Sequence, residues 1–226
     1  MHITTLGIDV AKNVFQLHGV DARGRAVLSR RVTRSQLLDA VASLPPCVIG
    51  MEACGSAQHW GRAFEQLGHR VKLMHPKYVR PSVKTNKNDR RDAEAICEAV
   101  SRPTMRCVSI KTVEQADLQA VHRTRSLFVK HRTAVINQIR GLLAEYGLVI
   151  GQSPEKVRPA LVRFLDDAAS GLTAFAELYA QLTELDSRIE RVTQRVECLF
   201  RAHPVCQKLA AVPGIGPLTA SPWSLP

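Results

Sequence analysis

The sequence lacks the signals of several protein classes. None of its six cysteines lies in a CxxC pair or at a zinc-finger spacing, so the thiols are expected to be reduced, as in a cytosol. The sequence has no signal peptide and no apolar run long enough to cross a membrane. These absences argue against a secreted, disulfide-rich or membrane protein and predict a soluble, intracellular one.

Acidic residues are also scarce. The chain has 20 Asp and Glu against 31 Lys and Arg, which gives a net charge of +11 and an isoelectric point near 9.8. This excess favours a polyanion partner, most simply nucleic acid, although solubility alone accounts for part of it. At 226 residues the chain can bury a real core in one or two domains.

The first half of the chain has the pattern of an α/β domain. Apolar, β-branched runs predict strands at 3–10, 14–20, 25–32, 47–51 and 70–74. Helices are expected at 34–43, with Leu37, Leu38 and Val41 inward, at about 58–67, and from about residue 87. The order β-β-β-α-β-α-β-α is the plan of a ribonuclease-H-like mixed sheet.

Four acids occupy informative places in this plan. Asp9 lies near the end of the first strand, and Glu52 follows the fourth, where functional groups of open α/β sheets collect. Asp89 and Asp92 have the spacing that places two carboxylates on one face at a helix start. Phosphodiester chemistry needs several converging carboxylates to hold two divalent cations. The alternative for 87–99 is an exposed helix start with a mixed-charge surface.

Basic residues lie around these acids and further along the chain. Each could contact a phosphate. A solvated surface is the alternative reading for each. The candidates are Lys12, Lys84, Lys87, Arg90, Arg91, Arg123, Arg125 and Arg140.

The second half predicts long helices. Residues 113–146 form a basic amphipathic pattern, and a smaller helix runs through Leu161 and Leu165. From about Gly171, apolar residues recur in alternating steps of three and four, which predicts a coiled-coil seam whose partner is either 113–146 or a second chain. Residues 212–220 resemble a helix-hairpin-helix turn, in which Gly214 and Gly216 let backbone amides approach a phosphate.

These motifs together resemble the DEDD-type transposases of bacterial insertion sequences, in the insertion-sequence one-ten family and its eleven-eleven subgroup. The resemblance covers residues 6–220. It is carried by Gly7-Ile8-Asp9-Val10-Ala11-Lys12, Gly50-Met51-Glu52-Ala53-Cys54-Gly55-Ser56, Lys87-Asn88-Asp89-Arg90-Arg91-Asp92-Ala93-Glu94-Ala95, His122-Arg123-Thr124-Arg125, Asn137-Gln138-Ile139-Arg140-Gly141-Leu142-Leu143 and Pro213-Gly214-Ile215-Gly216.

The resemblance implies a RuvC-like domain at 1–110 whose metal-binding, catalytic acids are Asp9, Glu52, Asp89 and Asp92, with Mg²⁺ or Mn²⁺ as cofactor. It implies a helical, coiled-coil region at 111–203 that supports a homodimer or higher oligomer. The implied partners are DNA, at the element ends and target, and a structured guide RNA. The implied location is the bacterial cytoplasm, at the nucleoid.

The family continues past the Pro-Gly-Ile-Gly turn to a nucleophilic serine, whereas residues 204–226 cover only the start of that domain. Ser221 and Ser224 do not match the context of that serine, so no nucleophile is assigned. The expectation is therefore a truncated, recombination-deficient copy.

Two other functions stay open. One is a non-catalytic nucleic-acid-binding or dimerisation protein, and the other is a nuclease that cleaves Holliday junctions with the four acids alone. A sugar-kinase-like activity is disfavoured, because residues 9–13 lack the Gly and Ser or Thr that hold a nucleotide phosphate.

Overall fold

The computed structural model describes residues 2–79, 89–167, 173–202 and 204–219. The chain divides into two compact units, one over residues 1–112 and one over 113–225. Each unit has its own core, and the two are described separately below.

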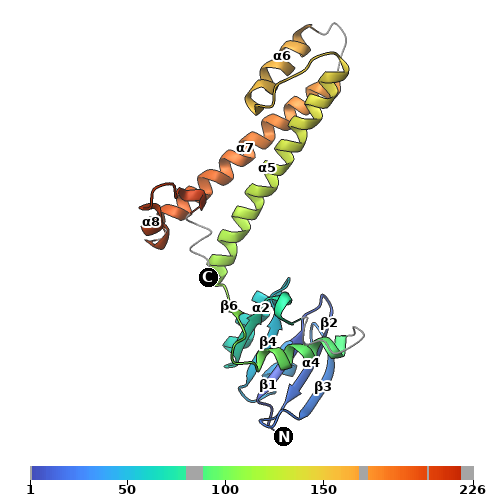
Figure 1. Cartoon of the computed structure of the whole chain (residues 1–226), viewed down its shortest axis with the longest axis vertical. Coiled ribbons are helices and arrows are strands. Elements are labelled where there is room, and N and C mark those ends of the chain that lie inside the picture. Colours follow the sequence, from blue (N-terminus) through green and yellow to red (C-terminus); the bar gives the residue numbers. More distant parts are fainter. Residues whose placement is uncertain (1, 80–88, 168–172, 203, 220–226) are drawn as a thin grey trace. The chain divides into compact units, whose positions relative to one another are not determined.

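Unit 1 is built on a six-stranded mixed sheet (Figure 1). Its strand order is β3-β2-β1-β4-β5-β6. β1 pairs antiparallel with β2 and parallel with β4; β5 is parallel to β4, and β6 is antiparallel to β5. The strands are β1 (Thr5–Asp9), β2 (Val14–Val20), β3 (Ala26–Thr33), β4 (Val48–Glu52), β5 (Arg70–Met74) and β6 (Cys107–Val108).

The alternation of side chains along the strands divides the core into two layers. Leu6 and Ile8 of β1 and Ile49 and Met51 of β4 pack into the larger core, with Phe64 of α2. Helices α1 (Leu37–Ala42) and α2 (Ala57–Gln66) cover this face. The other face carries α3 (Pro76–Val79) and α4 (Asp89–Val100), which pack with Val48 and Met74.

This strand order with helices on both faces is the ribonuclease-H-like arrangement that the sequence predicts. The predicted bounds of β2 and β5 are confirmed, and α4 begins at Asp89 as expected. Two elements were missed. α3 is a single turn directly after β5, and β6 is a two-residue strand whose pairing with β5 leaves no periodic signal in the sequence.

One prediction of a core residue is wrong. Leu37 and Val41 are fully buried, but the side chain of Leu38 is 42% exposed. α1 has only six residues, so it buries the single stripe formed by positions four apart, and the residue after Leu37 points away from the sheet.

Unit 2 is helical. Its long helices α5 and α7 pack against each other as an antiparallel hairpin (Figure 1). Apolar side chains of the predicted seam, including Phe175, Leu182 and Leu185, pack with Val135 and Ile139 of α5. This intramolecular pairing was one of the two predicted partners, and dimerisation stays a prediction. The helices are α5 (Val113–Glu145), η2 (Pro154–Lys156), α6 (Val157–Asp167), α7 (Thr173–Ala202) and α8 (Pro204–Ala210).

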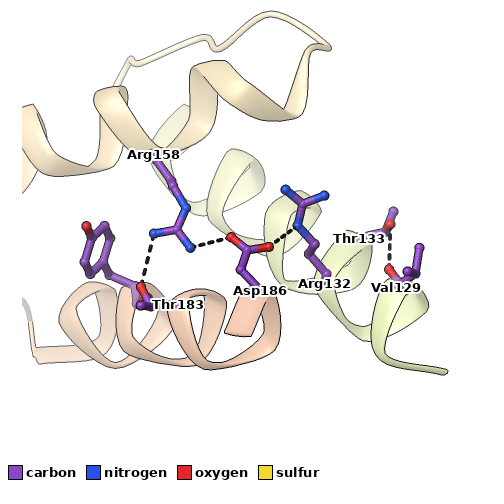
Figure 2. Close-up of polar contacts among 7 residues, drawn as sticks. Val129, Arg132, Thr133, Arg158, Thr183 and Asp186 are labelled. Carbon is purple, nitrogen blue, oxygen red and sulfur yellow. Dashed lines mark hydrogen bonds and ion pairs between the residues drawn. The ribbon is translucent and has the colours of Figure 1, made fainter. Parts of the chain in front are cut away.

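A shared carboxylate ties three of these helices together (Figure 2). Asp186 of α7 accepts a hydrogen bond from Arg158 of α6 at 2.6 Å and forms an ion pair with Arg132 Nε of α5 at 2.5 Å. Arg158 also donates to Thr183 Oγ1 at 3.1 Å, and its guanidinium lies over the Tyr179 ring. These contacts hold α6 against the second half of α5 and the first half of α7.

Among the described residues, no helix is long and apolar enough to span a membrane.

Candidate functional site

The candidate site lies at the carboxyl ends of β1 and β4. These strands are parallel neighbours with Ile8 opposite Met51, so the next residues, Asp9 and Glu52, stand beside each other at the strand ends. Ile8 and Met51 belong to the α1–α2 face. Alternation therefore turns Asp9 and Glu52 to the opposite face, the one that α4 covers.

Two glycines bring α4 close to this face. A Cβ on Gly7 would lie 2.3 Å from the Ala93 carbonyl oxygen, and one on Gly50 would lie 2.7 Å from Val100 Cβ. Only residues without a side chain therefore fit beneath the helix. Both glycines lie within the family motifs, but nothing in the sequence pattern predicts this role for either.

The contacts of α4 also give its direction. Cys97 Sγ donates to the Thr5 carbonyl at 3.8 Å, while Ala93, one turn earlier in the helix, lies over Gly7. α4 thus crosses β1 at an angle toward Gly50 of β4, where Val100 lies, and its earlier turns are nearer to the strand end that carries Asp9. Asp92 is half-buried in the first of these turns. Asp89 is the first residue of α4, but its side chain lies outside the described residues.

A thiol that sequence reasoning treated only as structural lies at the site. Cys54 Sγ donates to the Val10 carbonyl at 3.9 Å. Burial raises the pKa of this thiol, and the negative charges of Glu52 and Asp9 raise it further. Both carboxylates therefore act on one point beyond the strand ends. A cysteine two residues after a strand has no distinctive pattern, so the sequence could not have identified it.

The described residues do not complete a metal-binding group. Among them, no three His, Cys, Asp or Glu side chains are arranged so that they could hold a metal ion. The structure places Asp9 and Glu52 at neighbouring strand ends, but Asp92, whose side chain is described, does not complete a three-ligand group with them, and the side chain of Asp89 is not described. Carboxylate oxygens are the ligands that Mg²⁺ and Mn²⁺ prefer, so the donor chemistry fits a hard divalent cation.

Three of the predicted basic residues of unit 1 are described, and each belongs to a segment that also carries one of the acids. Lys12 is exposed just beyond β1, and its carbonyl accepts from Arg34 at 3.3 Å. Arg90 is exposed and Arg91 half-buried in the first turn of α4. Lys84 and Lys87 lie outside the described residues.

The predicted basic residues of unit 2 differ in what they contact. Arg123 is exposed. Arg125 Nε donates to Thr193 Oγ1 at 2.9 Å, and Arg140 donates to the carbonyls of Gly151 and Gln152. Arg125 and Arg140 therefore hold neighbouring segments of unit 2 in place.

The glycines of the predicted hairpin lie in a turn after α8. Gly214 has a φ of 85°, a conformation that favours glycine, and a Cβ on either Gly214 or Gly216 would meet open space. Ser221 and Ser224 lie outside the described residues.

Comparison with known proteins places the chain in a family. The family model DEDD_Tnp_IS110, described as "Transposase", matches residues 6–148. The transposase for insertion sequence element IS1111A of Coxiella burnetii is 45% identical over 223 residues, which cover 96% of this chain and 61% of that protein. The transposase for insertion sequence element IS1328 of Yersinia enterocolitica is 38% identical over 232 residues, with 97% and 66% covered.

A third relative, named "Probable family 20 transposase", comes from Pseudomonas aeruginosa and is 43% identical over 230 residues, with 98% of this chain and 67% of that protein covered. The chain thus spans about two thirds of the length of these curated relatives. A solved structure of T. thermophilus RuvC in complex with a Holliday junction substrate aligns with 47% of this chain at 13% identity and a TM-score of 0.37. On the family match and these identities, the chain belongs to the IS110 family of DEDD transposases.

Proposed function

We propose that unit 1 is the metal-dependent strand-cleaving domain of a transposase and that DNA is its substrate. The observation that carries the proposal is the position of Asp9 and Glu52 at the ends of adjacent parallel strands, on the face that α4 covers. In unit 1, carboxylates at strand ends and a helix start would form a single acidic site.

Asp9, Glu52, Asp89 and Asp92 would hold the cation, with Mg²⁺ as the expected ion and Mn²⁺ as its substitute. Bound divalent ions would stabilise the charge on the attacking and leaving oxygens of a phosphodiester. The carboxylates would fix the position of the scissile phosphate, and Cys54, held neutral near them, would add no charge to the site.

Nucleic acid as the partner is supported by the net charge of +11 and by exposed Lys12 and Arg90 near the acids. The family resemblance adds a structured guide RNA to DNA, and Arg123 on α5 is an exposed cation available to either. A homodimer through the helical hairpin belongs to the same proposal.

The direct test is cleavage of a labelled four-way DNA junction by the full chain. Wild type is expected to cut with Mg²⁺ and not with a chelator, and Asp92→Asn is expected to reduce cutting to background. Asp117→Asn changes an exposed acid on α5 and should cut like wild type. Cutting that is unaffected by Asp92→Asn would overturn the assignment.

A second candidate is a non-catalytic nucleic-acid-binding protein. It is favoured by the finding that no three potential ligands among the described side chains form a metal-holding group. Salt-sensitive binding of the junction without any cleavage in Mg²⁺ or Mn²⁺ would support this alternative.

A further inference from the structure

The register of the sheet places residues in a row with Asp9 that the sequence alone does not connect. Asp9 of β1 pairs with Gln16 of β2, and Gln16 pairs with Arg31 of β3. Paired residues of neighbouring strands share a face, so Arg31, Gln16 and Asp9 all point to the α4 side. Glu52 continues the row on β4.

Arg31 and its neighbour in the sequence provide an internal comparison. Arg30 pairs with Leu17, which is buried in the core beneath α1 and α2, so Arg30 points to the opposite face. Both arginines are exposed. They are one residue apart with the same charge, yet only Arg31 lies on the face of the candidate site. Two strand spacings, about 10 Å, separate its backbone from that of Asp9.

The β2 side chains between Arg31 and the acids are polar but buried, so a substrate can reach Arg31 at the sheet edge but not these side chains. Gln16 is buried, and its amide nitrogen donates to the Leu17 carbonyl at 3.4 Å. His18, the next residue of β2 on this face, is also buried. Burial lowers the pKa of the His18 imidazole below its usual value. The charge of Glu94 opposes this shift, and the charge of Arg90 adds to it. Glu94 and Arg90, both exposed on α4, are thus near enough to β2 to affect His18, and β2 pairs directly with the edge strand that carries Arg31.

We infer that the substrate strand approaches the site over the exposed edge strand β3, with one of its phosphates bound by Arg31 and another near Arg90 in the first turn of α4, so that the chain leads to Asp9 and Glu52. This inference rests on the proposed function and adds the path of the strand. A guanidinium at an exposed sheet edge suits a phosphate because it offers a planar fork of donors. The contact is with the backbone of the strand, so it carries no sequence preference.

The test compares Arg31→Ala with Arg30→Ala in the full chain. Binding of a fluorescently labelled four-way DNA junction is measured by anisotropy, in chelator to prevent cleavage, from about 50 to 200 mM salt. Arg31→Ala should weaken binding several-fold and lower the slope of log Kd against log salt by about one. Arg30→Ala should bind like wild type, and Arg31→Lys should recover most of the slope because it keeps the charge.

Different outcomes would overturn the proposed path of the strand and the proposed function. If wild type binds with salt sensitivity but Arg30→Ala and Arg31→Ala behave alike, the proposed path is wrong while the proposed function stands. If wild type shows no salt-sensitive binding, the proposed function fails and this inference fails with it. Neither side chain packs in a core cluster, so neither variant should disturb folding.

Discussion

At the scale of single residues, the site depends on positions that have no functional group. Gly7 and Gly50 let α4 lie against β1 and β4, and that contact places the earlier turns of the helix nearer to Asp9. The sequence shows where acids occur along the chain. It does not show which glycines make room for a helix, because that depends on the packing of segments far apart in the chain, as Gly7 is from Ala93 and Gly50 from Val100.

Replacing Gly7 with Ala should strongly destabilise unit 1. The new methyl group would lie 2.3 Å from the Ala93 carbonyl oxygen, so the helix must shift. Overpacking of this kind costs about 3 kcal/mol. Gly55→Ala is the control, because a Cβ there meets open space. Urea unfolding followed by circular dichroism measures both variants, and equal midpoints for the two would refute the packing role.

His69 predicts how the stability of unit 1 depends on pH. Burial lowers the pKa of this imidazole below 6.5, although a hydrogen bond to the Val41 carbonyl opposes the shift. Its Nδ1 accepts from the Cys47 amide at 3.3 Å, a bond that only the neutral ring can make. The adjacent Cys47 thiol, whose pKa burial raises to about 11, stays uncharged throughout.

The folded state therefore binds a proton on His69 less readily than the unfolded state. The stabilisation is present above pH 6.5 and is lost as the pH falls through the folded-state pKa. The free energy of unfolding should decrease from pH 7 to pH 5, and His69→Asn should flatten this decrease. Denaturant titrations at several pH values measure it, and an unchanged pH profile in the variant would exclude His69 as the cause.

At the scale of elements, those with a strong periodic pattern were predicted well, whereas those that depend on tertiary pairing were not. β2 and the α7 seam follow from alternation and from heptad spacing, since each pattern is complete within its own segment. β6 was missed because a two-residue strand is defined only by pairing with β5. Leu38 was placed inward because six residues are too few to show which side of a helix is buried.

The same reasoning applies to the candidate site. Sequence placed Asp9 and Glu52 at strand ends correctly, because a single acid after an apolar run is easy to recognise. The row from Arg31 through Gln16 to Asp9 depends on strand register, which a single sequence does not reveal.

Asp186 should matter more to unit 2 than other surface acids. Asp186→Asn weakens two arginine contacts that join α5, α6 and α7, and the expected loss of stability is about 1–2 kcal/mol. Among the described residues, the ion pair of Glu184 is with Arg188, one turn away in α7, so Glu184→Gln should cost less than about 0.5 kcal/mol. Thermal unfolding of the full chain measures both, and equal effects would show that the shared carboxylate has no special role.

At the scale of the whole molecule, the chain combines two units with different content. The α/β unit carries all four predicted metal-binding acids, and the helical unit carries none of them. The excess of basic residues provides attraction for a polyanion, and the carboxylates provide a local site of opposite charge. Such a combination suits chemistry on phosphates, because a strongly basic protein must concentrate negative charge wherever it binds a cation.

The most direct measurement of the central claim is binding of Mn²⁺ to the full chain, followed by the electron paramagnetic resonance signal of the free ion. Wild type should bind Mn²⁺, and both Asp9→Asn and Glu52→Gln should weaken that binding strongly. Asp39→Asn, which changes an exposed acid on α1 across the sheet, should bind like wild type. Wild-type affinity retained in both Asp9→Asn and Glu52→Gln would contradict a cation site at the ends of β1 and β4.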